Sequence, residues 1–337
     1  MTTPVLICDD SGFARRQMAR SVPDEWDIKI SFAENGEQAL EMIRQGKADV
    51  MFLDLNMPVM DGYQTMRAIK EQDLPCMVIV VSGDVQPEAR KRMMDLGALD
   101  FICKPIDNNK LSEILRQYGI FTGDTKATGT KDAEAVRANP SDRMDAYREM
   151  ANIAMGQAGE QLAKLLGHFI SLPIPNVNLI ESTELHMAIA EIKHNDRVSA
   201  ISKGFVSAGI NGEALVIFND TNIANIIGLL NYNYSEVNEQ LEVEALMDVS
   251  NILISACLNA LSTQLHVNFS HNHPIILGRN CDLDIMLSKN VSRWNKVLAI
   301  EIGYAIEGQD ISFDLLLLFP ETATDLLFEK LAKVTDL

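Results

Sequence analysis

The sequence lacks any long uninterrupted run of apolar residues. A helix that spans a bilayer needs roughly 18–20 mainly apolar residues, and Leu315–Phe319, one of the longer uninterrupted runs, suits a buried strand instead. The first ten residues also lack a basic segment followed by an apolar stretch, which is the usual pattern of a secretion signal. These absences favour a cytoplasmic protein without membrane insertion.

Cysteine is scarce, and its spacing excludes two common uses. The five cysteines are odd in number and include no Cys-x-x-Cys pair, so neither a disulfide framework nor a zinc site is expected. They are Cys8, Cys76, Cys103, Cys257 and Cys281. We interpret them as small core residues. His271 and His273 alternate as in a strand, but no third ligand lies nearby, so we expect loop residues before Pro274 rather than a metal site.

Excess positive charge is also absent. Lys and Arg number 29 against 47 Asp and Glu, a formal charge of −18. The balance of basic minus acidic residues is 14 − 19 = −5 for residues 1–122, 3 − 3 = 0 for 123–140 and 12 − 25 = −13 for 141–337. Such a surface repels phosphate backbones, so no nucleic acid partner is expected. Walker-type loops, Gly-rich dinucleotide turns and Ser or Cys nucleophile motifs are missing too.

What is present indicates two domains, because 337 residues exceed one ordinary core. Residues 1–122 alternate short apolar runs with amphipathic stretches, which predicts an α/β, doubly wound, flavodoxin-like domain with five parallel strands. The predicted strands are Val5–Cys8, Lys29–Ala33, Val50–Leu53, Met77–Val81 and Phe101–Cys103, and the predicted helices are Gly12–Arg20, Gly36–Gln45, Gly62–Gln72, Pro87–Leu96 and Asn108–Tyr118.

The rest of the chain contains a linker and an internal repeat. Residues 123–140 are rich in Gly, Thr, Ala and charge without an apolar period, which predicts a flexible linker. Within 141–337, three residues recur 99 positions later: Glu149, Asn152 and Pro175 as Asp248, Asn251 and Pro274. We therefore expect an α+β domain of two pseudo-symmetric αβ halves that share a sheet, with strand-like runs at 214–218 and 315–319.

Polar residues follow the predicted strands of the first domain. Because the ends of parallel strands meet at one edge, these side chains converge in a single crevice. They are Asp9 and Asp10 after the first strand, Asp54 after the third, Ser82 after the fourth and Lys104 after the fifth. Clustered carboxylates with one lysine suit a divalent, oxygen-preferring ion and an incoming phosphoryl group.

The segments VLICDD, FLDLNMPVMDG, VVSGD and FICKP resemble the receiver domains of two-component response regulators, CheY above all. The resemblance implies phosphorylation of Asp54 and a Mg²⁺ ion held by Asp9, Asp10, Asp54 and the main-chain carbonyl of Asn56. It also implies that Ser82 and Lys104 bind the phosphoryl group and that a cis peptide bond precedes Pro105. Phe101 lies where receivers have a switch aromatic, although a plain core Phe fits the position as well.

A polar stripe marks the start of the second domain. Residues Asp145, Glu149, Asn152 and Gly156 share one helical face at steps of 4, 3 and 4, opposite Met150, Ile153, Leu162, Leu165 and Leu166. A solvated helix face would explain one such stripe. Its recurrence at Glu244, Asp248, Asn251 and Ser255 favours a functional role instead.

The stripe resembles the signature of the CheC, CheX and FliY phosphatases, with Asp145, Glu149, Asn152 and Pro175 at the matching spacing. The resemblance implies that Glu149 contacts the lysine of a target receiver while Asn152 positions the attacking water. Asp248 departs from the pattern, because the family has Glu there. The second pair, Asp248 and Asn251, is then either a weaker catalytic site or a partner-binding face.

Two functions follow from these resemblances. The first is an aspartyl-phosphate phosphatase acting on a CheY-like receiver and regulated by phosphorylation of Asp54. The second is a non-catalytic binding module at a flagellar switch or adaptor, and retention of both Asn152 and Asn251 argues against it. Implied partners are a phosphorylated CheY-like response regulator, a CheA-like sensor histidine kinase, and a flagellar-switch or CheD-like protein. A DNA-binding regulator ranks third.

The linker also predicts coupling within the chain. A flexible segment of about 18 residues spans roughly 20–25 Å, enough for the first domain to reach a motif helix of its own chain. Either the first domain gates access of an external substrate to Asn152, or Asp54 is itself dephosphorylated. We expect gating, because a phosphatase that erased its own signal at once would escape control by it.

Overall fold

The computed structural model describes residues 2–121, 140–181, 184, 198–230, 232, 238–281 and 295–334, the side chains of 140–142, 280, 281 and 334 excepted. These residues form two compact units, one ending at Ile153 and the other comprising Ala154–Val334. Most of the predicted linker, residues 123–139, lies outside the described residues. The first part of one long helix, up to Ile153, belongs to the first unit.

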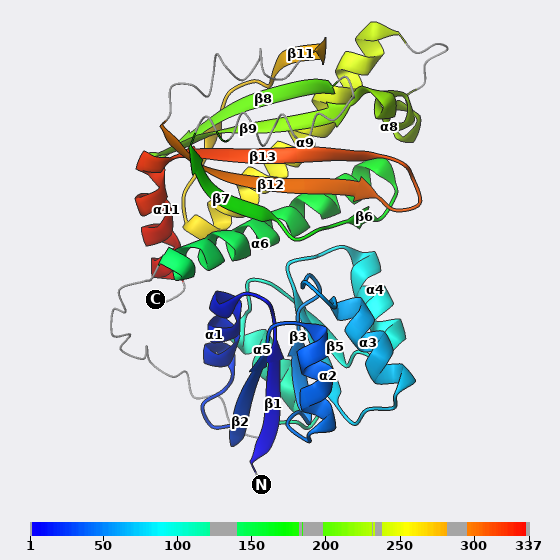
Figure 1. Ribbon diagram of the computed structural model, residues 1–337, viewed down its shortest axis with the longest axis vertical. Coiled ribbons are helices and arrows are strands. Elements are labelled where there is room, and N and C mark those ends of the chain that lie inside the picture. Colours follow the sequence, from blue (N-terminus) through cyan, green and yellow to red (C-terminus); the bar gives the residue numbers. More distant parts are fainter. Residues whose placement is uncertain are drawn as a thin grey trace. The chain divides into compact units, whose positions relative to one another are not determined.

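The first unit is built on a five-stranded parallel sheet with the strand order β2-β1-β3-β4-β5 (Figure 1). The strands are β1 Thr3–Cys8, β2 Ile28–Ala33, β3 Val50–Leu53, β4 Met77–Ser82 and β5 Asp100–Cys103. The helices are α1 Gly12–Ser21, α2 Gly36–Arg44, α3 Gly62–Glu71, α4 Pro87–Leu96 and α5 Asn108–Gln117. This is the flavodoxin-like order, so the predicted doubly wound fold is confirmed.

Capping residues explain where these helices begin. The Ser11 side chain accepts a hydrogen bond from the Ala14 amide at the start of α1. Asp61 caps α3 and forms a reciprocal capping box with Gln64. Proline occupies the first turn of α4, where a missing amide hydrogen costs nothing. Strands β3 and β4 are almost fully buried, which is why they read as continuous apolar runs.

The second unit is an antiparallel eight-stranded sheet with helices. Its main path is β10-β8-β9-β13-β12-β6, with β11 beside β8 and β7 beside β12. The strands are β6 Ile170–Ser171, β7 Asn176–Glu181, β8 Val198–Ser207, β9 Ile210–Asn219, β10 Ser270–His271, β11 Ile275–Cys281, β12 Lys296–Ile306 and β13 Ser312–Pro320. The helices are α6 Pro140–Leu166, shared with the first unit, η1 Asp220–Asn222, α8 Ile223–Leu229, α9 Glu239–Leu265 and α11 Glu321–Val334.

The repeat predicted from the sequence is visible in these elements. Helices α6 and α9 have 27 residues each, and α9 begins 99 positions after α6. Short strands β6 and β7 pair with β12, whereas β10 and β11 pair with β8, so each half completes the sheet of the other. The two halves join where β9 pairs with β13. The expected runs 214–218 and 315–319 lie within these two central strands.

Helix α9 is a core helix of the second unit (Figure 1). Its Cys257 sulfur contacts the main-chain oxygen of Ala154 in α6 and the buried Tyr304 hydroxyl of β12. In the described part of the chain it is also the one helix long and apolar enough to cross a membrane by length and composition. More than half of its most apolar window, 56%, is buried inside the protein, as expected of a helix that packs against a sheet.

The histidine prediction needs a correction. His271 is not a loop residue, because β10 pairs it with Phe205 of β8, whereas His273 does lie outside a strand. The expectation of core cysteines outside disulfides holds for Cys8 and Cys257, while Cys76 and Cys103 are not in disulfides but are half-buried. The side chain of Cys281 lies outside the described residues. Trp26 is buried against Phe121.

We expect the Asp314→Asn variant to be more stable than the parent at neutral pH. Burial, and then the nearby Glu301, raise the pKa of the Asp314 carboxyl from 3.8 to about 6. Between these values the folded chain keeps a proton that the unfolded chain releases, so stability falls as pH rises through this window. The gain in the free energy of unfolding should be about 1–2 kcal/mol at pH 7 and near zero at pH 4.

Urea denaturation of the full chain at both pH values measures this difference. The matched control is Asp310→Asn, at an exposed position. Its effect on the free energy of unfolding should be the same at both pH values. An Asp314→Asn gain of equal size at pH 4 and pH 7 would contradict the assignment.

Candidate functional site

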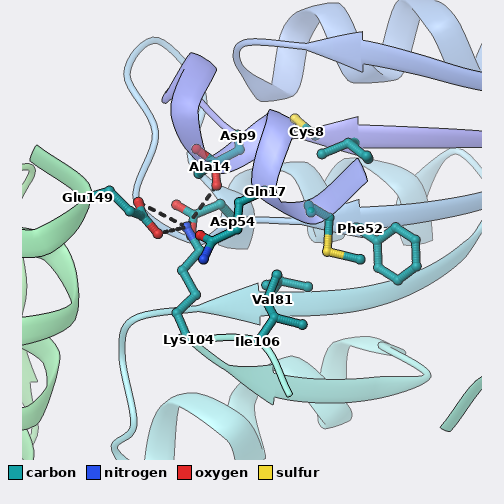
Figure 2. Close-up of a pocket in the computed structure, with 12 residues that line it drawn as sticks. Cys8, Asp9, Ala14, Gln17, Phe52, Asp54, Val81, Lys104, Ile106 and Glu149 are labelled. Atoms are coloured by element: carbon teal, nitrogen blue, oxygen red, sulfur yellow. Dashed lines mark hydrogen bonds and ion pairs between the residues drawn. The ribbon is translucent and has the colours of Figure 1, made fainter. Parts of the chain in front are cut away.

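The polar residues predicted at the ends of the parallel strands do converge. Asp9 follows β1, Asp54 follows β3, Ser82 ends β4 and Lys104 follows β5. Figure 2 shows Asp9, Asp54 and Lys104 pointing toward one another at the edge of the sheet. Asp9, Asp54 and Lys104 also line one narrow cavity. The peptide bond between Lys104 and Pro105 is cis, as expected.

Lys104 is the centre of the cluster. Its Nζ lies 2.8 Å from Asp9 Oδ2 and 3.1 Å from Asp54 Oδ1, and all three side chains are buried. Burial alone would lower the pKa of the Lys104 ammonium, but the carboxylates of Asp54 and Asp9 raise it well above its ordinary value. The lysine therefore stays charged and offsets a surplus of negative charge.

Two carboxyl groups of the cluster are poorly stabilised as anions. Burial raises the pKa of Asp54 to about 7, against the lowering effect of Lys104. Burial, followed by repulsion from Asp9 and Asp54, raises the pKa of Asp10 to about 7. The main-chain amides of Ser11 and Asn56 donate 2.8 Å hydrogen bonds to Asp9 Oδ1 and Asp54 Oδ2 and hold these carboxylates in place.

The donor chemistry fits the Mg²⁺ ion that the sequence resemblance implies. Hard divalent cations take oxygen ligands, and an added positive charge would relieve the repulsion that raises the pKa values of Asp10 and Asp54. The present arrangement is organised around Lys104. Within the described ranges, no group of three or more His, Cys, Asp or Glu side chains is positioned as a metal cluster.

Ser82 and Phe101 are both inside the unit. The Ser82 side chain is fully buried, and its Oγ accepts a 3.1 Å hydrogen bond from the Asp84 amide. Phe101 on β5 is 1% exposed, which places it inward. An inward aromatic fits both interpretations offered by the sequence, a switch residue and a plain core residue.

Glu149 on α6 joins the cluster. Its Oε1 lies 3.1 Å from Lys104 Nζ, and the side chain is buried (Figure 2). Burial raises the pKa of the Glu149 carboxyl, and Lys104 opposes that rise. The face of α6 that carries Glu149 and Asn152 is thus not solvated, since the two residues are 3% and 6% exposed.

Asn152 lies one helical turn beyond Glu149. Its Oδ1 is buried and has no hydrogen-bond partner among the described residues. The α6 backbone at this turn approaches the loop after β4 closely, because a Cβ added at Gly83 would lie 2.9 Å from the Asn152 main-chain oxygen. A buried amide oxygen without a partner is costly, so this position is suited to binding a further molecule. The sequence analysis had not singled out Gly83, although VVSGD contains it.

The second stripe, on α9, is built differently. Asp248 and Asn251 are exposed, and each already has a partner in the chain. The Tyr232 hydroxyl donates a 2.6 Å hydrogen bond to Asp248 Oδ2, and Lys203 Nζ donates one of 2.8 Å to Asn251 Oδ1. Burial lowers the pKa of Lys203. Sequence reasoning missed this lysine, whose signal was a charged residue inside the otherwise uncharged strand VSAISKGFVS.

Comparisons with known proteins identify the first unit. The response regulator receiver domain model matches residues 5–116. The protein-glutamate methylesterase/protein-glutamine glutaminase of Bacillus licheniformis is 35% identical over 133 residues, 37% of this chain and 37% of that protein. The probable C4-dicarboxylate response regulator DctR of Bacillus subtilis is 33% identical over 137 residues, 41% of this chain and 55% of that protein. The chain thus spans well under two thirds of either relative.

Solved structures give weaker likenesses. The crystal structure of Thermotoga maritima FliY is 18% identical, covering 59% of this chain and all of that chain at a TM-score of 0.45. The response regulator domain of Thermotoga maritima CheB is 29% identical, covering 36% of this chain and all of that chain at 0.33. Scores below 0.5 establish no shared fold, so the assignment depends on the matched model, the relatives and the parallel sheet. Residues 5–116 of this chain are a response-regulator receiver domain.

Proposed function

We propose that the chain is a chemotaxis signalling protein in which an acid–amide pair removes phosphate from the phosphorylated aspartate of a receiver. One observation carries this proposal. Glu149 meets the lysine of a phosphorylation site at 3.1 Å, and Asn152, one turn later, has a buried amide oxygen without a described partner. We further propose domain boundaries at 1–122 for the receiver, 123–140 for a linker and 141–337 for a CheC-like phosphatase domain.

The chemistry of an acyl phosphate makes two residues sufficient. The P–O bond is already activated, so a catalyst mainly has to hold water in line with it. An amide side chain donates and accepts at once, which suits Asn152 to orient that water. Glu149, ion-paired with a receiver lysine, would fix the helix at the reacting phosphorus. Neither role requires proton transfer by a group with an unusual pKa.

The receiver would supply the regulation. In this proposal Asp54 accepts phosphate, Ser82 and Lys104 bind the phosphoryl oxygens, and Phe101 responds to the closure of Ser82. Asp9, Asp10, Asp54 and the Asn56 carbonyl would hold Mg²⁺, as receiver domains generally do at the phosphorylation site. The bound ion would neutralise the phosphoryl charge. A cytoplasmic location and a histidine-kinase partner of the CheA type belong to this proposal.

A second candidate function, as a binding module, has one observation in its favour. Asp248 and Asn251 are exposed, yet Tyr232 and Lys203 each donate a hydrogen bond to one of their oxygens. A pair satisfied within the chain is less available to orient water, and an exposed helix face of this kind suits a docking surface. In this alternative the α9 stripe binds a flagellar-switch or adaptor protein under control of receiver phosphorylation, and the chain performs no catalysis.

We expect Asn152→Ala to lower phosphate release from a separately phosphorylated CheY-type receiver by about 10²-fold, because an orienting group acts mainly in the transition state. Asn251→Ala is the matched control at the same place in the repeat and should have a smaller effect. Glu149→Gln should mainly weaken association with the substrate receiver. The measurement is release of inorganic phosphate under multiple-turnover conditions, with receiver concentration varied to separate KM from kcat.

Unchanged turnover in the Asn152→Ala, Asn251→Ala double variant would overturn the phosphatase proposal and favour the binding module.

A further inference from the structure

We propose that the phosphorylated Asp54 of this same chain is a substrate of the Glu149–Asn152 pair. The inference deepens the proposed function and rests on it, since it names the receiver on which the pair acts. It also departs from the sequence-based expectation that the receiver merely gates access for an external substrate.

The first argument is that one lysine serves both groups. Lys104 Nζ lies 3.1 Å from Asp54 Oδ1 and 3.1 Å from Glu149 Oε1. Figure 2 shows Glu149 directed at this nitrogen from α6 while Asp54 approaches from the sheet. Glu149, the acid proposed to contact the lysine of a target receiver, therefore already forms an ion pair with Lys104 of the receiver in its own chain.

The second argument is the fit of the helix against the loop after β4. Gly83 follows Ser82, and a Cβ at this position would lie 2.9 Å from the Asn152 main-chain oxygen and 3.3 Å from the Ile153 nitrogen. Real Cβ atoms essentially never lie within 3.0 Å of another heavy atom, so a side chain at residue 83 would force a shift. The amide-bearing turn thus approaches the loop at a residue without a side chain, which brings Asn152 next to the hydroxyl-bearing end of β4.

The third argument is the unused amide oxygen. Asn152 is 6% exposed, and its Oδ1 has no hydrogen-bond partner among the described residues. Asn152 and Glu149 are three residues apart on one helix, so their Cβ atoms lie about 5–6 Å apart on the same face. Asn152 is therefore one helical turn from the carboxylate that contacts Lys104. A water molecule above the phosphorus of phosphorylated Asp54 would give Oδ1 its missing donor.

The reaction needs no further reagent. The oxygen of one water forms a bond to phosphorus while the bond between phosphorus and the Asp54 carboxyl oxygen breaks. The electron pair of the broken bond returns to the carboxylate, and the water proton leaves with the phosphate or enters solvent. The products are unmodified Asp54 and inorganic phosphate.

The test is the lifetime of phosphate on the full chain after labelling with a small acyl phosphate donor and removal of that donor. We expect first-order loss whose rate does not change with protein concentration, because the pair and its substrate belong to one molecule. In Asn152→Ala the lifetime should increase about tenfold or more, as expected when an orienting group is lost. Asn259→Ala, at an exposed position of α9 that has no part in the proposed chemistry, should leave it unchanged.

Gly83→Ala is a second, independent test of the inference, because this substitution changes neither Glu149 nor Asn152. A methyl group there should displace the helix, lengthening the lifetime at Asp54 while raising turnover of an external phosphorylated receiver, because Asn152 becomes free to reach it. Gly228→Ala in α8 is the matched control, since a Cβ there meets nothing within 4 Å, and should change neither rate.

Equal lifetimes in the parent and Asn152→Ala, or loss that accelerates with protein concentration, would overturn the inference. If Asn152→Ala slowed turnover of an external receiver without lengthening the Asp54 lifetime, the result would support the proposed phosphatase activity and contradict self-dephosphorylation. If neither rate changed, both proposals would be contradicted.

Discussion

Asp54→Asn should abolish phosphoryl uptake by the full chain. The carboxylate at the end of β3 is the nucleophile in the proposed reaction, and an amide does not form an acyl phosphate. In the parent protein, chelation of Mg²⁺ should have a comparable effect. Lys104 faces both Asp9 and Asp54, and Asp10 is close enough to these two carboxylates for repulsion to raise its pKa. A dianionic phosphoryl group would add to this charge.

Incubation with a labelled acyl phosphate, with and without chelator, measures uptake. Asp61→Asn is a suitable control, because Asp61 caps α3 and is not one of the carboxylates proposed to take part in phosphoryl transfer. Persistent acid-stable labelling of Asp54→Asn that resists hydroxylamine would indicate another phosphoacceptor. Uptake that continues at full rate in chelator would contradict the role given to the ion.

Lys104→Met should lower the free energy of unfolding by about 3 kcal/mol or more at pH 7.5 in the absence of divalent ions. Removing one partner of a buried ion pair leaves the other charge uncompensated. Here the ammonium faces three buried carboxyl groups, of Asp9, Asp54 and Glu149, all within 3.1 Å of its Nζ. Millimolar Mg²⁺ should restore part of the loss, because it supplies positive charge at the same place.

Urea denaturation in chelator and in Mg²⁺ gives the two free energies. The exposed Lys110 on α5 provides the matched substitution, Lys110→Met, which should change stability little in either buffer. A Lys104→Met variant as stable as the parent in chelator would contradict this prediction. It would show that the three buried carboxyl groups do not need the lysine charge to be stable.

The receiver fold was predictable because its signals are local. Each predicted strand and helix of residues 1–122 overlaps an observed element, with ends that differ by at most two residues. Buried parallel strands read as apolar runs, and Ser11 and Asp61 mark helix starts by their capping chemistry. The repeat was equally accessible, since a spacing of 99 residues needs no knowledge of contacts. The prediction that His271 lies in a loop was wrong, because a strand of two residues is too short to produce a recognisable alternation of apolar and polar residues.

The candidate site divides in the same way. The convergence of Asp9, Asp54 and Lys104 follows from the rule that parallel strands end at one edge. The use of Gly83 and Lys203 does not follow from any local pattern. The role of Gly83 becomes apparent only when the α6 backbone is found packed against it. The role of Lys203 in β8 becomes apparent only when α9 places Asn251 2.8 Å from its Nζ.

The sequence by itself therefore determined the receiver, the duplicated acid–amide stripe and the residues worth testing, because strand burial, helical period and repeat spacing are properties of neighbouring positions. Tertiary structure decided what distinguishes the two stripes. Glu149 lies buried on Lys104, and the nearby Asn152 Oδ1 has no hydrogen-bond partner among the described residues, whereas Asp248 and Asn251 are exposed and bound to Tyr232 and Lys203. Two stripes with the same spacing differ in this way because partners distant in the chain, not the helical pattern, set their burial and charge.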